Sequence, residues 1–380
     1  MKKLFSILLI SIGCLSITAG VSAKEYKKLP APVWTIAAPL NGVNDVRVTN
    51  NRIYALSFND TFIYKDATGE EAAAITSPSA LNSSYFDVHL KLVDKQGNFY
   101  WIVTTMDKVT QEHTFYLKAY SPSGALLWTK AFPEKGKFPS MDVRAFMQSD
   151  GTLLVALKTN YNQYMTYKFN RQGKQLQKKQ INGYVDSFYN DILATLSNQS
   201  NTGKFKATLS IYDAALNFKF KQQITDEKFY CMLPDGTLIF IKNNDKTPDK
   251  VILTARNQSG TTLWNKSFAS GKIQWFSTQS TQPFPYGFLL QTDHALYLLN
   301  NKGLVSQLAV NPDSDVQIGG DGSILIQGSQ HLTLAKGSDL SILHTVSNPD
   351  SIWGYREFLY GGNGILYQYA NKQFYKYDLN

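Results

Sequence analysis

The sequence predicts an all-β fold: a β-propeller of four-stranded blades, with eight blades favoured, closed by an N-terminal strand. Three observations lead to this prediction. A glycine-containing turn recurs along the chain, a second class of turn lies upstream of it in most units, and the two ends of the chain have complementary strand patterns. Seven blades remain the alternative, because the unit near 184–224 is irregular.

The first recurring turn follows two or three apolar residues and precedes a strand that often contains Trp. Glycine recurs there because the position needs a left-handed backbone, which a Cβ atom disfavours. Successive turns lie about 43 to 55 residues apart, close to the roughly 40 to 50 residues of a propeller blade. The turn positions are Gly69, Gly124, Gly173, Asn217, Gly260 and Gly303.

A second class of turn has glycine after a polar residue and stands before a β-rich segment. Asp-Gly between apolar runs is a strong signal for a β-hairpin. These turns are Gln96-Gly97, Asp150-Gly151, Asp235-Gly236, Asp321-Gly322 and Asn363-Gly364.

A third recurrence marks where the innermost strand of each unit begins. Five of these openings start with an aspartate: Asp45, Asp87, Asp142, Asp186 and Asp315. With three further openings, in which Tyr230, Trp275 and Gly354 take the third position, the units start near 45, 87, 142, 186, 228, 273, 315 and 352. This count gives the eight blades.

The two ends of the chain suggest how the ring closes. Residues 373–380 resemble the third strand of a unit and have no strand after them. Trp34 lies in an early segment whose pattern matches the fourth strands around Trp128 and Trp264. An N-terminal strand that completes the last blade would remove an exposed sheet edge. The three tryptophans share one repeat phase and are expected to be core residues.

The first 23 residues have the pattern of a secretory signal peptide. A basic start at Lys2 and Lys3 precedes an apolar centre and small residues up to Ala23. We therefore expect a mature propeller domain of 24–380 in a secreted or extracytoplasmic location, with no transmembrane segment after the signal is removed. Lipid attachment at Cys14 is the alternative. If Cys14 leaves with the signal, Cys231 has no disulfide partner and is expected to be a small buried apolar residue.

The repeats resemble those of quinoprotein-like (PQQ-repeat-like) β-propellers. The residues that carry the likeness are the Asp-Ala-Thr-Gly-Glu run at 66–70 and the Ser-Gly…Leu-Trp segments at 123–128 and 259–264. The resemblance implies a fold rather than an activity, because that group includes both quinone-dependent dehydrogenases and non-enzymatic envelope proteins. Many of the alcohol dehydrogenases carry an adjacent Cys-Cys pair beside the cofactor, and this chain has none. A non-catalytic branch is therefore favoured.

The openings of the inner strands supply the candidate ligand-binding residues, since such positions lie near the mouth of a propeller's central channel. Arginine, histidine and aromatic side chains there would suit an anionic or sugar-like ligand. The alternative is that they pack between blades or face solvent. The candidates are Arg47, His89, Arg144, Tyr230, Trp275 and Gln317.

No motif in the sequence points to catalytic residues or to a metal site. The five histidines show no ligand spacing, and there is no nucleophile elbow. The repeated aspartates could hold a cation at the axis, although such residues more often accept hydrogen bonds from local backbone N–H groups. No cofactor is predicted, and the sequence leaves a quinone or a calcium ion open.

The chain is basic, with a formal net charge of +9, so anionic neighbours are expected. Export argues against nucleic acid as a ligand, so we expect a protein partner or an anionic envelope polymer. The predicted function is a non-catalytic binding or scaffold propeller. The alternative is a secreted quinoprotein-like or lyase-like enzyme with its site in the central channel.

Overall fold

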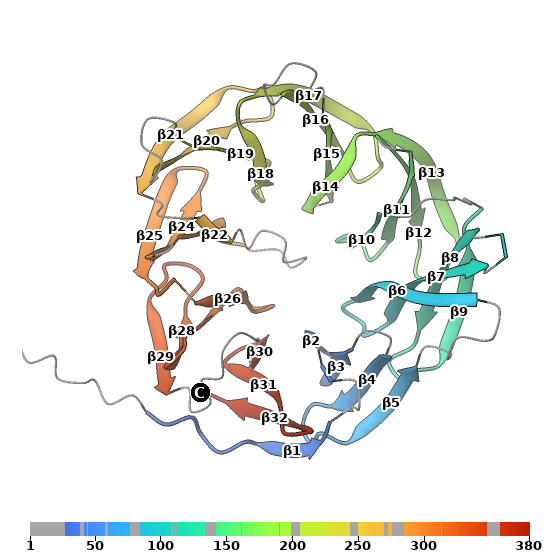
Figure 1. The fold of residues 1–380 in the computed structure, drawn as a ribbon, viewed down its shortest axis with the longest axis vertical. Helices are drawn as coiled ribbons and strands as arrows, with labels where there is room; N and C mark the ends of the chain where they lie inside the picture. Colours follow the sequence, from blue (N-terminus) through green and yellow to red (C-terminus); the bar gives the residue numbers. More distant parts are fainter. Residues whose placement is uncertain are drawn as a thin grey trace, which may run out of the picture.

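The computed structural model is an eight-bladed β-propeller, as the sequence predicts (Figure 1). Each blade is an antiparallel sheet of four strands, and the first strand of each blade lies toward the centre of the ring. The structure describes residues 27–38, 42–43, 45–57, 60–76, 84–107, 109–110, 112–133, 142–160, 162–189, 191–198, 206–243, 250–269, 273–275, 285–292, 294–312, 314–347 and 358–380.

The strands follow one another from the inside of each blade to the outside. Blades 1 to 4 are β2 (Asp45–Thr49), β3 (Arg52–Leu56), β4 (Asp60–Lys65), β5 (Glu71–Thr76); β6 (Ser84–Val93), β7 (Phe99–Asp107), β8 (His113–Tyr120), β9 (Leu126–Ala131); β10 (Val143–Met147), β11 (Leu153–Asn160), β12 (Gln163–Phe169), β13 (Gln175–Asn182); and β14 (Tyr184–Tyr189), β15 (Ile192–Asn198), β16 (Lys206–Tyr212), β17 (Phe218–Thr225).

The second half of the ring repeats this order. Blades 5 to 8 are β18 (Lys228–Met232), β19 (Leu238–Asn243), β20 (Lys250–Arg256), β21 (Thr262–Ala269); β22 (Ile273–Trp275), β23 (Phe288–Thr292), β24 (Ala295–Asn300), β25 (Gly303–Ala309); β26 (Asp315–Ile318), β27 (Ile324–Gln327), β28 (His331–Ala335), β29 (Ile342–Ser347); and β30 (Phe358–Gly362), β31 (Ile365–Ala370), β32 (Gln373–Asp378) with β1 (Trp34–Ala37).

The N-terminal strand closes the ring as expected. β1 pairs antiparallel with β32, with Trp34 opposite Lys376 and Ala37 opposite Gln373. Just before β1, the N–H of Ser347 in β29 donates to the carbonyl of Lys27 at 2.8 Å. The N-terminal segment therefore contacts the outer strand of blade 7 before it completes blade 8.

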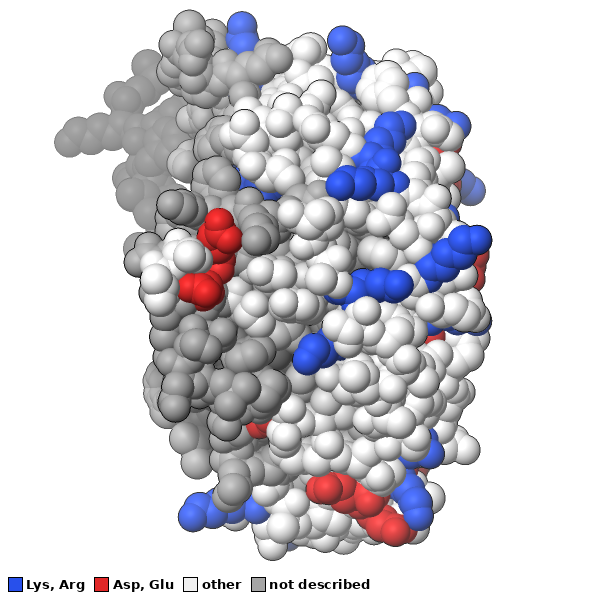
Figure 2. All heavy atoms as spheres, turned by 90° about the vertical axis from the view of Figure 1, so that its right-hand side faces the viewer, with Lys and Arg blue, Asp and Glu red and all other residues white. Residues whose placement is uncertain are grey.

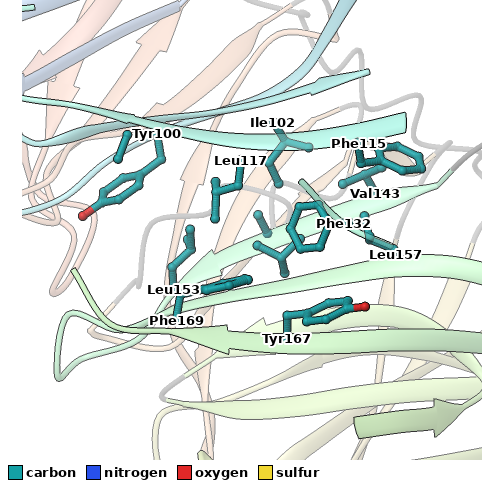
Figure 3. Packing of buried hydrophobic residues seen from close by; sticks show 13 residues of the cluster. Tyr100, Ile102, Phe115, Leu117, Phe132, Val143, Leu153, Leu157, Tyr167 and Phe169 are labelled. Carbon is teal, nitrogen blue, oxygen red and sulfur yellow. The ribbon is translucent and has the colours of Figure 1, made fainter. Parts of the chain in front are cut away.

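Packing between blades explains the large number of aromatic residues. The buried hydrophobic residues form clusters that each join two neighbouring blades, and such a cluster lies at every one of the junctions around the ring. Figure 3 shows the one between blades 2 and 3, where Phe132 meets Tyr167 with ring centroids 5.0 Å apart. Rings of this size fill the widening gap between two twisted sheets.

The tryptophans of the outer strands have one shared role. The indole N–H of Trp34 donates to the Asp66 carbonyl at 3.0 Å, that of Trp128 to the Arg171 carbonyl at 2.8 Å, and that of Trp264 to the Asn301 carbonyl at 2.9 Å. Each acceptor lies in the turn between the third and fourth strands of the next blade. The repeated Trp is therefore a link between blades, which confirms its assignment to the packing of the repeat.

The turn glycines have the conformation that their recurrence predicts, with one correction. Gly173, for example, has a φ of 75° and lies directly under the Trp128 ring. In blade 4, however, the left-handed residue is Leu216 (φ 57°), and not Asn217. Leu216 is fully buried between blades 3 and 4, so apolar packing holds this leucine in a conformation that disfavours a Cβ atom.

Cys231 is a free thiol, 7% exposed, as expected for a small buried apolar residue. Burial raises the pKa of this thiol well above its usual value, so the thiol stays neutral. In the described part of the chain, no helix is long and apolar enough to cross a membrane.

Candidate functional site

Three of the predicted site residues stand two positions after an aspartate and contact it. Arg47 Nη2 lies 2.9 Å from Asp45 Oδ2, and Arg144 Nε lies 2.9 Å from Asp142 Oδ1. Gln317 Nε2 donates to Asp315 Oδ2 at 3.1 Å. Residues i and i+2 of a strand lie on one face of the sheet, so each aspartate can orient the side chain two positions after it. The repeated Asp-x-Arg/Gln opening is thus a local side-chain pair at the start of three inner strands.

Arg144 contacts residues of two blades. Besides its ion pair with Asp142, it donates to the hydroxyl of Tyr184 in β14, and its guanidinium lies 5.4 Å from the centre of that ring. Tyr164 donates to Asp142 at 2.7 Å, so the carboxylate is itself held in place. The group therefore joins the inner edge of blade 3 to that of blade 4, with the guanidinium oriented by fixed partners.

The charge of Arg144 is well maintained. Burial alone would lower its pKa, but the negative charge of Asp142 and the contact with Tyr184 outweigh that effect and raise the pKa above its usual value. Burial and the nearby carboxylate of Asp142 also raise the pKa of Tyr164, so this phenol stays neutral. The side chain of Arg144 is 36% exposed and that of Arg47 30% exposed, so both guanidinium groups still reach solvent.

Gln317 and Tyr230 each bridge to the next blade. Gln317 Nε2 donates to the Phe358 carbonyl at 2.7 Å, and its Oε1 accepts from the N–H of Tyr360 at 3.0 Å, so it pairs with the inner strand of blade 8. The Tyr230 hydroxyl donates to the carbonyl of Leu289 in blade 6 at 3.1 Å. These contacts match the alternative in which inner-strand side chains pack between blades.

The remaining predicted residues are placed only by their backbone. His89 lies in β6 and Trp275 in β22, and their side chains fall outside the described part of the structure. The same holds for the side chain of Asp87, while Gly354 lies outside the described residues altogether. Their roles in ligand binding remain predictions, as do those of Arg47, Arg144, Tyr230 and Gln317.

Three of the repeated aspartates, Asp45, Asp142 and Asp315, make contacts with neighbouring protein groups. Asp45 accepts from the N–H of Val46 at 2.8 Å as well as pairing with Arg47. Within the described residues, His, Cys, Asp and Glu side chains form no group of three or more that could hold a metal ion.

Two hollows of about 290 Å³ each lie away from these residues. Both are lined by uncharged amide and hydroxyl side chains and by backbone, except for one aspartate. The first lies between blades 3 and 4 and is lined by Asn160, Asn162, Gln163, Asn182, Gly183 and Ser197; the second lies at the turns of blade 5 and is lined by Asp235, Gly236, Thr237, Asn257, Gln258 and Ser259. Neither hollow contains a predicted site residue, and composition gave no signal for either.

The charges on the side wall of the ring are a feature that sequence reasoning missed. Figure 2 looks onto the side of the ring where β9 and β13 lie in Figure 1, and Lys and Arg side chains are prominent across the middle of this wall. In the sequence the lysines look scattered, because residues on neighbouring outer strands are far apart in the chain. A comparison of the outer strands position by position would have shown the pattern.

No protein-family model matches the chain, and no curated protein matches it. Solved structures do resemble it. One is described as a eukaryotic initiation factor, with 11% sequence identity, a TM-score of 0.45, and coverage of 93% of this chain and 94% of the other. Another is the WD40 domain of SCAP from fission yeast, with 10% identity, a TM-score of 0.34, and coverage of 88% of this chain and 84% of the other.

Proposed function

We propose that this chain is an exported, non-catalytic binding propeller that contacts a protein or an anionic polymer of the cell envelope. The observation that supports it is the pair of oriented, solvent-reaching guanidinium groups at the inner strands of blades 1 and 3. Arg47 and Arg144 each lie 2.9 Å from an aspartate two residues earlier, and each keeps about a third of its side chain exposed. A guanidinium held in this way loses little freedom when it binds a carboxylate or phosphate.

The fold supports a binding role in a second respect. Eight blades linked at every junction by buried clusters give a rigid ring, so residues at the inner strands keep fixed positions. A rigid scaffold lowers the entropic cost of binding, because few side chains have to be ordered. Export follows from the signal peptide expected over residues 1–23, and it brings the protein to the anionic polymers that its basic charge suits.

The proposal is tested by retention of the purified protein on envelope fractions across a salt series. The wild type is compared with Arg47→Ala/Arg144→Ala and with the control Lys130→Ala/Lys302→Ala, which removes the same charge from exposed positions in β9 and in the turn before β25. Salt-sensitive retention that only the arginine variant loses is the expected result, because ion pairs with a polyanion weaken as salt rises. Equal retention of all three proteins, or no retention of the wild type, would overturn the proposal.

A further inference from the structure

The lysines of the outer strands are concentrated on two neighbouring blades. β13 carries Lys178 and Lys179, and β17 carries Lys219 and Lys221. Neither strand contains an acidic residue. The other six outer strands together contain Lys130, Lys266 and Glu71. The positive charge of the outer wall is therefore polarised toward blades 3 and 4.

Two of these lysines, Lys178 and Lys221, occupy equivalent places and are exposed, with Lys178 Nζ 5.2 Å from the centre of the Tyr167 ring on the neighbouring strand of its own sheet. Lys178 and Lys221 each stand five residues after the left-handed turn residue of their blade, Gly173 and Leu216 respectively, and both are exposed. Lys179 alternates to the other side and donates to the Leu216 carbonyl at 2.8 Å, which fixes β13 against the turn that begins β17. The two strands thus belong to neighbouring blades in contact, and Lys178 and Lys221 hold the same position in their repeats.

Further charges and apolar groups complete the surface. Lys174 is exposed in the turn before β13, and Lys219 pairs with Asp213 at 2.9 Å while keeping 54% of its side chain exposed. Two large apolar residues, Leu176 (50% exposed) and Phe218 (52% exposed), stand at the starts of the same strands. We call this surface the lateral lysine patch: Lys174, Leu176, Lys178, Phe218, Lys219 and Lys221.

Within the described residues, no further strand pairs with the outer edges of β13 and β17. β13 and β17 are the last strands of their four-stranded sheets, so each presents one row of backbone N–H and C=O groups outward. An alternative explanation is that lysines on an edge strand are there simply to prevent aggregation. That explanation does not account for their distribution, since β25 and β29 are outer strands without lysine and also carry exposed apolar residues such as Leu304 and Ile342.

We propose that the lateral lysine patch docks an extended, acidic segment of a protein partner along the β13 and β17 edges. Carboxylates of the segment would meet Lys178, Lys219 and Lys221, while its apolar side chains would cover Leu176 and Phe218. Main-chain hydrogen bonds to a sheet edge provide affinity in this mode of recognition, and alternate side chains provide specificity. A phosphate-rich or acidic sugar polymer would use the charges but neither the apolar residues nor the edge, so the combination favours a protein. This inference goes beyond the proposed function, because it uses a surface separate from the inner-strand arginines.

The test measures binding of a fluorescently labelled peptide of alternating Glu and Val by anisotropy. Lys178→Glu/Lys221→Glu reverses the charge of the patch, and Lys130→Glu/Lys302→Glu makes the same change of charge at exposed positions outside it, in β9 and in the turn before β25. We expect the patch reversal to weaken peptide binding about tenfold or more and the control to change it less than about twofold, since only direct pairs survive screening. Thermal melts of both variants check that the ring remains folded.

Two further comparisons separate the possible ligands and sites. Phe218→Ser should weaken binding of the peptide and leave binding of inorganic polyphosphate unchanged, because only the peptide has apolar side chains that cover the Phe218 ring. Arg47→Ala/Arg144→Ala should leave peptide binding intact, whatever its effect on retention by envelope fractions. The proposal is overturned if the wild type does not bind the peptide at about 1 mM, if the patch and control variants bind it equally, or if Phe218→Ser has no effect on it.

Discussion

The contacts of Asp66 provide a sharp test of how the ring is closed. Asp66 lies in the turn between β4 and β5, and its carboxylate accepts from Lys376 Nζ at 2.6 Å and from the Tyr367 hydroxyl at 3.0 Å. Its carbonyl accepts from Lys376 Nζ at 3.1 Å and from the Trp34 indole. One residue of blade 1 thus holds the N-terminal and C-terminal strands of blade 8.

The two sides of this ion pair should respond unequally to substitution. The Lys376 side chain is only 9% exposed, so Asp66→Ala leaves a nearly buried ammonium without its carboxylate, at a cost of about 3 kcal/mol. The Asp66 side chain is 27% exposed and keeps its bond from Tyr367, so Lys376→Met should cost about 1 kcal/mol. The double variant should cost about 1 to 2 kcal/mol less than the sum of the two changes.

Urea unfolding followed by tryptophan fluorescence and circular dichroism measures these free energies. The control is the exposed ion pair of Lys65 and Glu70, which has a similar length (2.7 Å) and side chains that are 53% and 63% exposed. It is tested with Lys65→Met and Glu70→Ala, and the pair should contribute less than about 0.5 kcal/mol to the free energy of unfolding. For a chain of this size, a loss of 3 kcal/mol lowers Tm by about 4 °C, at roughly 2.1 cal/mol/K per residue. The reasoning is refuted if Asp66→Ala costs no more than the exposed pair, or if Lys376→Met is the more damaging change.

Three other predictions concern processing, turn geometry and pH. The mass of the exported protein should correspond to a chain that starts at Lys24; a lipid-modified mass would contradict this. Gly173→Ala should destabilise the fold by about 2 to 3 kcal/mol in thermal melts, because a Cβ there lies 2.7 Å from the Trp128 ring at a φ of 75°, whereas Gly320→Ala, with no atom within 4 Å, should cost less than about 1 kcal/mol. Burial alone would raise the pKa of Asp213, but hydrogen bonds from a lysine and two backbone N–H groups lower it. The Asp213 carboxylate therefore stabilises the fold fully above the pKa of an unfolded aspartate, about 4, and this contribution is lost as the pH falls below that value. Asp213→Asn should then make the free energy of unfolding fall less steeply with pH on the acid side, and an unchanged slope would contradict this.

The architecture could be predicted because it depends on signals that repeat. Glycines in left-handed turns and aspartates near strand starts recur in most of the blades, so one ambiguous copy does not change the predicted fold. The exception at Leu216 arises because burial between two blades offsets the strain of a positive φ, and that burial is a tertiary property. Strand pairing at the closure was also predictable, since Trp34 has the same place in its repeat as Trp128 and Trp264.

The candidate site was less accessible to sequence reasoning. The position of Gln317 at an inner strand was correctly inferred, yet its amide pairs with the backbone of blade 8, which depends on the distance between blades. The Arg144–Tyr184 contact likewise joins residues from two blades. The lateral lysine patch was missed because Lys178 and Lys221 are brought together only by the ring.

The pairing of β1 with β32 also affects the order in which the protein can fold. The two strands are more than 330 residues apart in sequence, so blade 8 cannot be completed until β32 has been synthesised. Until then, β1 and the neighbouring edges of the unfinished ring are unpaired and open to the wrong partners. A chain that stops short of β32 would keep these edges exposed permanently, which makes incomplete synthesis an expected route to aggregation for this protein.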